Sequence, residues 1–129
     1  MMTGPGTNSY LIGSRHLALV DPGPADPQHL QAILRHLDGR ELGWIFVTHT
    51  HSDHSPGTAA LKAATGARVI GLRAPEGGYQ DRSFEPDRVF LPGEIIDCDE
   101  FTMQLVHTPG HVSNHFCFLL EPESMLFTG

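Results

Sequence analysis

The feature that most restricts the fold of this chain is a continuous apolar run, Trp44-Ile45-Phe46-Val47, that leads directly into a polar cluster at residues 49–54. Strands covered on one face alternate apolar and polar residues, whereas a strand buried on both faces reads as an unbroken apolar run. Sheets that contain such strands have helices packed against them. We therefore expect residues 44–47 to be an interior strand of a covered sheet.

The elements around this run predict an α/β first half. Asp26 is a suitable N-cap and Pro27 is favoured at the first helical position, so a helix begins there, and Gly39 ends it. A second helix, rich in alanine, is expected at residues 58–65. The predicted strands of this half lie at residues 7–13, 16–21, 44–47 and 68–71.

The second half predicts β-structure after a long loop. Residues 74–92 lack periodicity and contain three prolines and two glycines. Four short strands are expected after it, at residues 94–97, 102–107, 115–120 and 125–127. A length of 129 residues with 40% hydrophobic residues suits one globular domain. The chain ends on an apolar strand without a polar tail, so we expect a single domain, 1–129, that is incomplete at its C-terminus.

The composition argues against several classes of protein. No apolar stretch approaches the ~20 residues that span a membrane, and residues 1–6 lack the charged start and apolar run of a secretory signal. Cys98 and Cys117 are too few for a disulfide framework and are expected as thiols of a cytoplasmic protein, although a single bridge between them stays open. The net charge is −7 and the eight Lys and Arg residues are scattered, which argues against a tight grip on a polyanion.

Four residues of metal-binding types lie within six positions, directly after the apolar strand. His49 and His51 are two residues apart, so on an extended segment both side chains point the same way. Asp53 and His54 follow where the chain turns toward the next helix. A tight loop can aim the first pair at one point and the second pair at a neighbouring point, which is the arrangement needed for two metal ions held close together.

The first metal requires a third ligand, because two histidines alone bind weakly. His111 follows the strand at 102–107 in a Thr-Pro-Gly-His turn, and loops at strand ends are where α/β folds gather their sites. Three imidazoles with one open position are the composition of a hydrolytic zinc site. The predicted metal ligands are His49, His51, Asp53, His54 and His111.

The other histidines have more ordinary explanations. His16, His29 and His36 are expected as satisfied surface or core residues, since a lone histidine is more often one of these than a ligand. His107 lies in a strand beside the site and is expected to be structural. For His115, a supporting place next to the site and a direct metal role both stay open.

At these residues the chain resembles the metallo-β-lactamase superfamily, whose signature is His-x-His-x-Asp-His after a buried strand. Asp21 resembles the family's structural aspartate, and residues 108–111 resemble its second metal motif. Residues 126–129 resemble the strand that, in the family, leads to a metal-bridging aspartate. Residues 6–11 and 111–115 are most similar to the endoribonuclease-like and glyoxalase II-like branch. A histidine at position 51 favours zinc, since iron-binding relatives tend to carry glutamate there.

The resemblance implies an α/β fold, the N-terminal half of an αββα sandwich with a mixed sheet and helices on one face. It also implies a strand before Met1, so the domain is expected to be incomplete at the N-terminus as well. The bridging aspartate and the last metal histidine of the family would come after Gly129. One or two zinc ions are therefore expected, with an incomplete second site.

The function that the resemblance implies is hydrolysis of an ester, thioester or phosphodiester by a metal-activated water. Asp53 is the expected catalytic residue, which ligates the second metal and orients the nucleophile. A small-molecule substrate is expected, and RNA stays open because a metal centre can engage a phosphate by itself. The alternative is a catalytically inactive metal-binding fragment, or a module that forms a homodimer through an uncovered sheet face.

Overall fold

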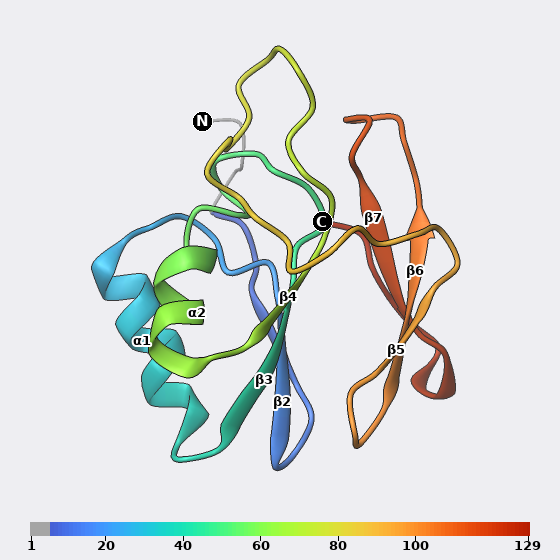
Figure 1. Ribbon diagram of the computed structural model, residues 1–129. Coiled ribbons are helices and arrows are strands. Elements are labelled where there is room, and N and C mark those ends of the chain that lie inside the picture. Colours follow the sequence, from blue (N-terminus) through green and yellow to red (C-terminus); the bar gives the residue numbers. More distant parts are fainter. Residues whose placement is uncertain (1–5) are drawn as a thin grey trace.

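The computed structural model describes residues 6–129; residues 1–5, on which the expectation of no secretory signal largely rests, lie outside this range. The chain folds into three layers, namely two helices, a four-stranded sheet and a second four-stranded sheet. In Figure 1 the helices lie to the left of the first sheet and the second sheet lies to its right. The predicted α/β architecture with helices on one face of a mixed sheet is confirmed.

The first sheet is mixed and has the apolar run in its interior. Its strands, in spatial order, are β1 (Tyr10–Ile12), β2 (His16–Val20), β3 (Glu41–Phe46) and β4 (Arg68–Ile70). β1 and β2 are antiparallel, while β2, β3 and β4 run parallel. Because β3 pairs on both sides and is covered on both faces, Ile45 and Phe46 are fully buried, as an unbroken apolar run requires.

Both helices begin and end close to the predicted residues. In α1 (Pro27–Leu37) the Asp26 side chain caps the helix by accepting a hydrogen bond from the backbone N–H of His29 at 2.9 Å. Asp38, and not Gly39, is the C-cap of α1; it adopts the left-handed conformation with a φ of 50° because an aspartate tolerates this region better than most residues. α2 (Thr58–Thr65) spans the predicted range.

The second sheet is an antiparallel meander. Its strands, in spatial order, are β5 (Ile95–Asp97), β6 (Thr102–His107), β7 (Phe116–Leu120) and β8 (Met125–Phe127), with the short 3-10 helix η1 (Glu121–Glu123) before the last. All four strands agree with the predicted ranges to within one residue. The local alternation and turn residues of this half were thus sufficient to place its elements.

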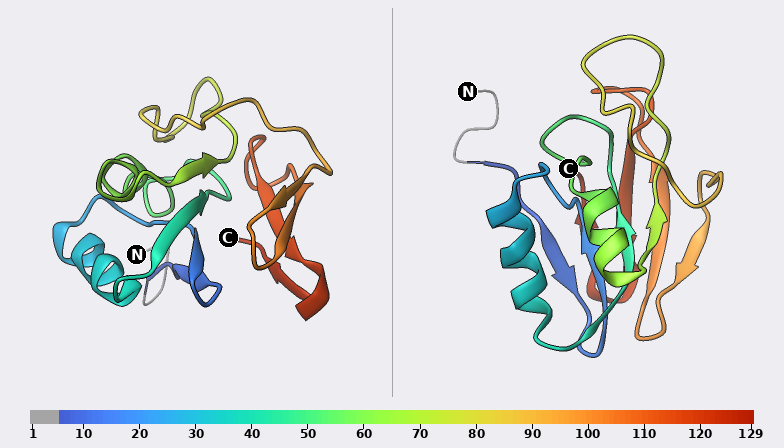
Figure 2. Two further views of the ribbon diagram at one scale, coloured as in Figure 1. Left: turned by 60° about the horizontal axis from the view of Figure 1, so that its bottom comes forward. Right: turned by 60° about the vertical axis from the view of Figure 1, so that its left-hand side comes forward.

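Two hydrophobic clusters hold the three layers together. One lies between the helices and the first sheet and contains Ile33, Leu37 and Leu61 of the helices. The other lies between the two sheets, where Phe46 of β3 and Phe118 of β7 meet edge to face with ring centroids 5.1 Å apart. Figure 2 shows the two sheets facing each other, with the helices outside the first. The first sheet is therefore covered on both faces.

The outer face of the second sheet carries no helix within residues 6–129. Ile95, Gln104, Leu119 and Leu126 are paired across the four strands on that face. Ile95 and Leu126 are 62% and 53% exposed. This outer row, which consists of three apolar side chains and the polar Gln104, is thus partly open to solvent in the described part of the chain.

Cys98 and Cys117 are both buried and free, so the prediction of thiols is confirmed and no bridge joins them. Burial and the charges of Asp97 and Asp99 raise the pKa of the Cys98 thiol to about 12. Neither helix in the described range has the length and the apolar character needed to cross a membrane.

Replacing Phe118 with alanine is expected to lower the free energy of unfolding by about 3–5 kcal/mol, because a cavity opens between the sheets at a fully buried position. Urea unfolding followed by circular dichroism measures the change. Leu126→Ala, which truncates an exposed apolar side chain, is the control and should cost less than about 1 kcal/mol. Equal losses for the two variants would show that the sheets do not share a core.

Candidate metal centre

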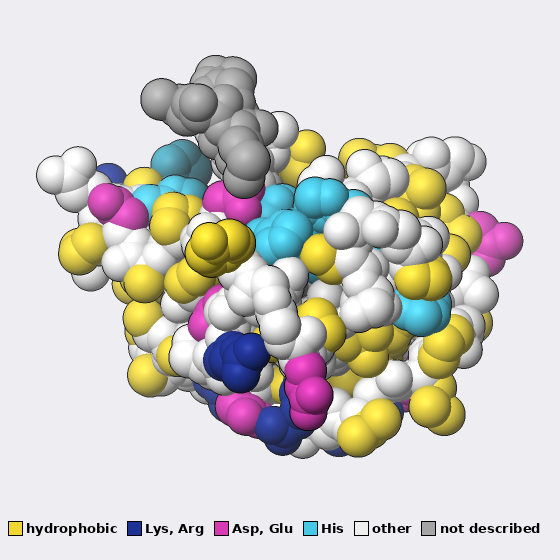
Figure 3. Space-filling model, turned by 90° about the horizontal axis from the view of Figure 1, so that it is seen from above, with side chains coloured by type: hydrophobic (Ala, Val, Ile, Leu, Met, Phe, Trp, Pro, Cys, Tyr) yellow, Lys and Arg dark blue, Asp and Glu magenta, His cyan; other side chains and the backbone are white. Residues whose placement is uncertain are grey.

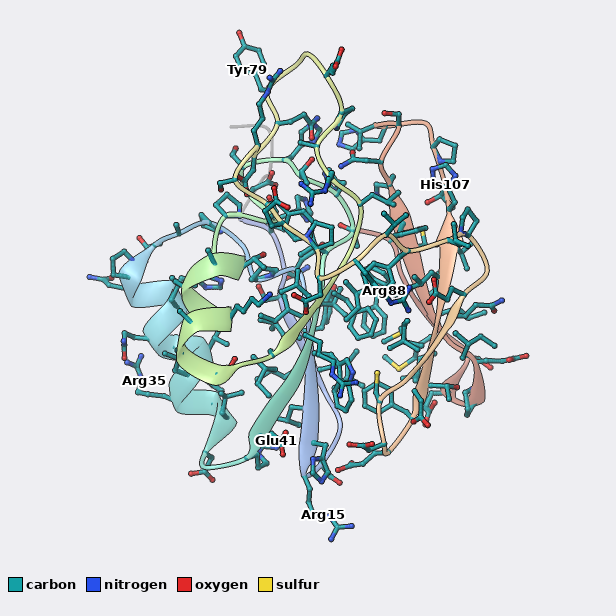
Figure 4. All side chains as sticks on the ribbon, viewed as in Figure 1. Arg15, Arg35, Glu41, Tyr79, Arg88 and His107 are labelled. Atoms are coloured by element: carbon teal, nitrogen blue, oxygen red, sulfur yellow. The ribbon has the colours of Figure 1, made fainter. Side chains whose placement is uncertain are left out.

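The predicted ligands lie in a cleft at one end of the two sheets. The loop after β3 (residues 47–57) and the loop between β6 and β7 (residues 108–115) meet there, and Figure 3 shows histidine side chains grouped on this end of the molecule. The cleft has a volume of about 1020 Å3, and Tyr79, from the loop between β4 and β5, also lines it. Figure 4 shows Tyr79 and His107 at this same end.

Three of the predicted ligands converge on one point. Nε2 of His49 and Nδ1 of His51 are 3.0 Å apart, and Nε2 of His111 lies 3.1 Å from the same His51 atom. The three nitrogen atoms all lie within 4.8 Å of one another. His49 is buried whereas His111 is exposed, so the shared point can be reached from the cleft.

This set of nitrogen atoms fits a zinc ion. Tetrahedral zinc with Zn–N bonds of about 2.0–2.1 Å separates its ligand atoms by about 3.3 Å. The two shorter separations found here differ from that value by only a few tenths of an ångström. Imidazole nitrogens that face one another need a proton or a cation between them, and one metal ion satisfies all three at once.

A buried carboxylate fixes the orientation of His49. Asp21 accepts hydrogen bonds from the backbone N–H of Thr48 at 2.7 Å and from its hydroxyl at 2.8 Å. Because this hydroxyl donates its single proton to Asp21, it can only accept at its 3.0 Å contact with Nδ1 of His49. Nδ1 of His49 therefore carries the ring proton, and Nε2 keeps the lone pair that a metal requires.

The same carboxylate orients His54. Nδ1 of His54 donates to Asp21 at 2.8 Å, and Nε2 lies 3.3 Å from a carboxylate oxygen of Asp53. Asp53 in turn accepts a hydrogen bond from the hydroxyl of Thr7 at 2.6 Å. Burial lowers the pKa of His54, but the hydrogen bond to Asp21 and the charges of Asp21 and Asp53 outweigh it, so the pKa is raised. Asp53 and His54 thus form a second polar pair in the cleft that holds the three histidines.

Neutral imidazoles are favoured at the point where the three histidines meet. Burial, followed by the charges of the neighbouring histidines, lowers the pKa of His49 to about 3. Burial and His111 also lower the pKa of His51, against the opposing charge of Asp53. Near neutral pH both rings are therefore unprotonated at one nitrogen, which is the state that binds a metal. The metal-binding role of the five predicted ligands stays a prediction.

His115 lies next to His49, with ring centroids 5.1 Å apart and ring planes 29° from parallel. Its Nδ1 contacts the hydroxyl of Thr108 at 2.9 Å. Burial is the main cause of its lowered pKa, and the charge of Asp21 opposes the shift. It is not one of the three histidines whose nitrogens share a point, and in this structure it packs against the ring of His49.

The remaining histidines make hydrogen bonds or ion pairs elsewhere. A ring nitrogen of His16 lies 3.3 Å from the Glu41 carboxylate. The ring nitrogens of the other three contact backbone carbonyl oxygens: His29 that of Pro22 (2.9 Å), His36 that of Ala32 (2.8 Å) and His107 that of Ser113 (3.0 Å). Each of these rings therefore has a partner of its own outside the group of three.

Sequence reasoning missed several polar residues that hold the cluster in place. Thr48 and Thr50 flank His49, and hydroxyl residues beside histidines in a buried segment were a signal that could have identified them. Asn114 donates to the Thr50 hydroxyl at 2.8 Å, and Gln80 accepts from the same hydroxyl at 2.6 Å. These two partners are 64 and 30 positions away from Thr50, so nothing local in the sequence marked them.

Comparison with known proteins relates this sequence to a family and to two named relatives. The sequence pattern of the Metallo-beta-lactamase superfamily matches residues 2–129. Lactamase-like protein aptB of Emericella nidulans is 37% identical over 96% of this chain, and Thioesterase pkgB of the same organism is 35% identical over 96% of it. The chain spans 39% and 35% of the lengths of these two relatives.

A solved structure shows the same fold. The BLEG-1 B3 metallo-beta-lactamase superimposes with a TM-score of 0.75 over 93% of this chain and 65% of that protein. The two sequences are 22% identical. The similarity therefore concerns the arrangement of the strands and helices.

The metal-free chain is expected to lose stability as the pH falls from 7 to 5. His49 in the unfolded chain takes up a proton below pH ~6.5, whereas folded His49 stays neutral down to about pH 3 because its pKa is lowered. The contribution of His49 is about 2 kcal/mol over this range. Urea unfolding at both pH values, compared with His49→Gln, isolates it. Parallel pH profiles for the wild type and the variant would contradict this expectation.

Proposed function

The chain belongs to the metallo-beta-lactamase superfamily, and we propose that the protein is a zinc-dependent hydrolase. The observation that carries this proposal is the convergence of ring nitrogens from His49, His51 and His111 on one point. Three imidazoles are a donor set that suits zinc and leaves one position open. A zinc ion bound there would polarise the oxygen of a substrate and lower the pKa of water toward ~7.

Asp53 is the proposed catalytic residue. Burial raises its pKa, but the hydrogen bond from Thr7 and the charge of His54 outweigh burial and lower the pKa overall. The carboxylate is therefore ionised near neutral pH and can accept a proton from the attacking water. Together with His54 it also offers two ligands for a second ion, which would need further ligands beyond these two.

The proposed substrate is a small molecule that carries an ester or thioester. The relative named Thioesterase pkgB supports a thioester, and the cleft of about 1020 Å3 is of the size that holds a small-molecule ligand. RNA, whose phosphodiester bonds such a site could hydrolyse, stays open as an alternative substrate. The scattered Lys and Arg residues argue against a tight grip on it. A cytoplasmic location, where thiols such as Cys98 and Cys117 stay reduced, is part of the proposal.

His51→Ala is expected to weaken zinc binding by about 100-fold or more, because it removes the nitrogen that lies close to both other ligands. It should also abolish release of free thiol from a thioester probe. Zinc bound after dialysis, about one ion per chain for the wild type, measures the first effect.

His36→Ala is the matched control for this variant, since it removes a histidine from α1, outside the cleft. The control should bind zinc as the wild type does. Unchanged zinc content in His51→Ala would contradict the proposed metal site. Zinc binding without hydrolysis by the wild type would favour the metal-binding fragment as the alternative.

A second candidate property is self-association through the outer face of the second sheet. The outer row that includes Ile95 and Leu126 has no covering helix within residues 6–129, and exposed apolar surface favours association. Two copies related by a two-fold axis would bury the same row against itself. The proposed partner is therefore a second copy of this chain.

Ile95→Lys is expected to shift a dimer toward the monomer, because it places a charge at one end of the row that the two copies would bury. Sedimentation velocity over a range of protein concentrations measures the equilibrium. Tyr79→Lys, at a 98% exposed residue of the cleft loop, is the control and should leave the dimer intact. A wild-type chain that stays monomeric at every concentration would exclude this mode of association.

A further inference from the structure

A largely buried chain of side-chain hydrogen bonds runs directly beside the three histidines. The amide of Asn114 donates to the Thr50 hydroxyl at 2.8 Å, and this hydroxyl lies 2.6 Å from the side-chain oxygen of Gln80. The hydroxyl has one proton, which it gives to the Gln80 oxygen, so it must accept from Asn114. The three side chains come from three different loops, and all three loops line the cleft.

This chain of contacts touches both segments that carry the ligands. Thr50 is fully buried between His49 and His51, and Asn114 follows His111 by three residues. Apart from the histidines themselves, the two segments are joined by the bond from Asn114 to Thr50 and by a backbone bond from Phe116 to Thr48 at 2.8 Å. These two hydrogen bonds, together with the packing of the two sheets, therefore hold His111 at its distance from the other two rings.

The side chain of Asn114 is held by its donor group. Besides Thr50, its Nδ2 lies 3.2 Å from the carbonyl oxygen of Arg73 and 3.4 Å from that of Leu72. Its Oδ1 is buried and has no hydrogen-bond partner among residues 6–129. A buried polar atom without a partner destabilises a fold. An apolar side chain would avoid that penalty, so the amide is better explained by what its donor group positions.

The third loop is tied to Thr50 twice. Besides the bond to Gln80, the backbone N–H of Asp81 donates to the carbonyl oxygen of Thr50 at 2.6 Å. The Asp81 carboxylate then accepts from the hydroxyl of Ser55 at 2.6 Å. Thr50 is thus clamped through both its backbone and its side chain, which fixes the direction in which its two histidine neighbours point.

We propose that Thr50 and Asn114 are positioning residues that set the affinity of the three-histidine site for a divalent metal ion. The inference rests on the proposed metal binding by His49, His51 and His111. Thr50 fixes the first two rings, and Asn114 holds the loop of the third ring against them. Neither side chain contacts the metal; both act by keeping three nitrogen atoms at the separation that zinc requires.

The test compares zinc affinities, measured by competition with a chromogenic chelator. Thr50→Val keeps the shape of the side chain and removes the hydroxyl, so it should weaken zinc binding by about 10–100-fold. Thr50→Ser restores the hydroxyl and should bind zinc within about threefold of the wild type. Thr65→Val, which removes a hydroxyl bonded to the carbonyl of Leu61 at the end of α2, is the matched control and should not change the affinity.

A spectroscopic signature separates positioning from general destabilisation. The Co2+-loaded wild type should show the visible absorption of a tetrahedral site, and Thr50→Val should shift or weaken it. Gln80→Leu changes a half-buried loop residue and replaces Thr50→Val as the test variant if Thr50→Val does not fold. It should lower zinc affinity several-fold, since the Thr50 hydroxyl loses its acceptor.

Each outcome supports or overturns the inference. Loss of affinity in Thr50→Val with rescue by Thr50→Ser supports it. The inference is overturned if Thr50→Val binds zinc as tightly as the wild type, or if the valine and serine variants lose affinity equally. If Thr50→Val does not fold, unchanged zinc affinity in Gln80→Leu overturns it. In each of these cases the proposed metal site stands. A wild type that binds no zinc overturns both the inference and the proposed function.

Discussion

Asp21 lies in the left-handed region of the backbone with a φ of 52°, and its buried carboxylate accepts hydrogen bonds from Thr48 and His54. Residues other than glycine adopt this conformation infrequently, although aspartate tolerates it better than most, and a buried carboxylate is costly unless its oxygens are satisfied. The contacts that satisfy it also decide which nitrogen of His49 and which nitrogen of His54 faces the cleft. The stability of this turn and the chemistry of the cleft therefore depend on the same carboxylate.

The packing of the two sheets completes the centre. His49 and His51 follow a strand of the first sheet, whereas His111 lies between two strands of the second. The third nitrogen reaches the other two only when the sheets pack through contacts such as that of Phe46 with Phe118. Metal binding at this point is thus coupled to the fold, because an ion held by ligands from both sheets stabilises the state in which they are packed.

The sequence predicted those parts of the structure that depend on local signals. The range of α2 follows from an alanine-rich segment before Gly66, and the strand position of residues 44–47 follows from their apolar run. The junction of His111 with His51 could be anticipated because strand ends meet at one edge of a fold. The contacts of Thr50 with Asn114 and Gln80 could not, since they depend on the paths of three loops and on the rotamers of side chains far apart in sequence.

X-ray absorption spectroscopy of the zinc-loaded chain tests most directly whether the three histidines hold the metal. Coordination by His49, His51 and His111 predicts a first shell of nitrogen and oxygen atoms at about 2.0–2.1 Å, with the outer-shell scattering of about three imidazole rings. His111→Ala should lower the imidazole count by one. A sulfur shell at about 2.3 Å, or a zinc environment without imidazole scattering, would contradict the account.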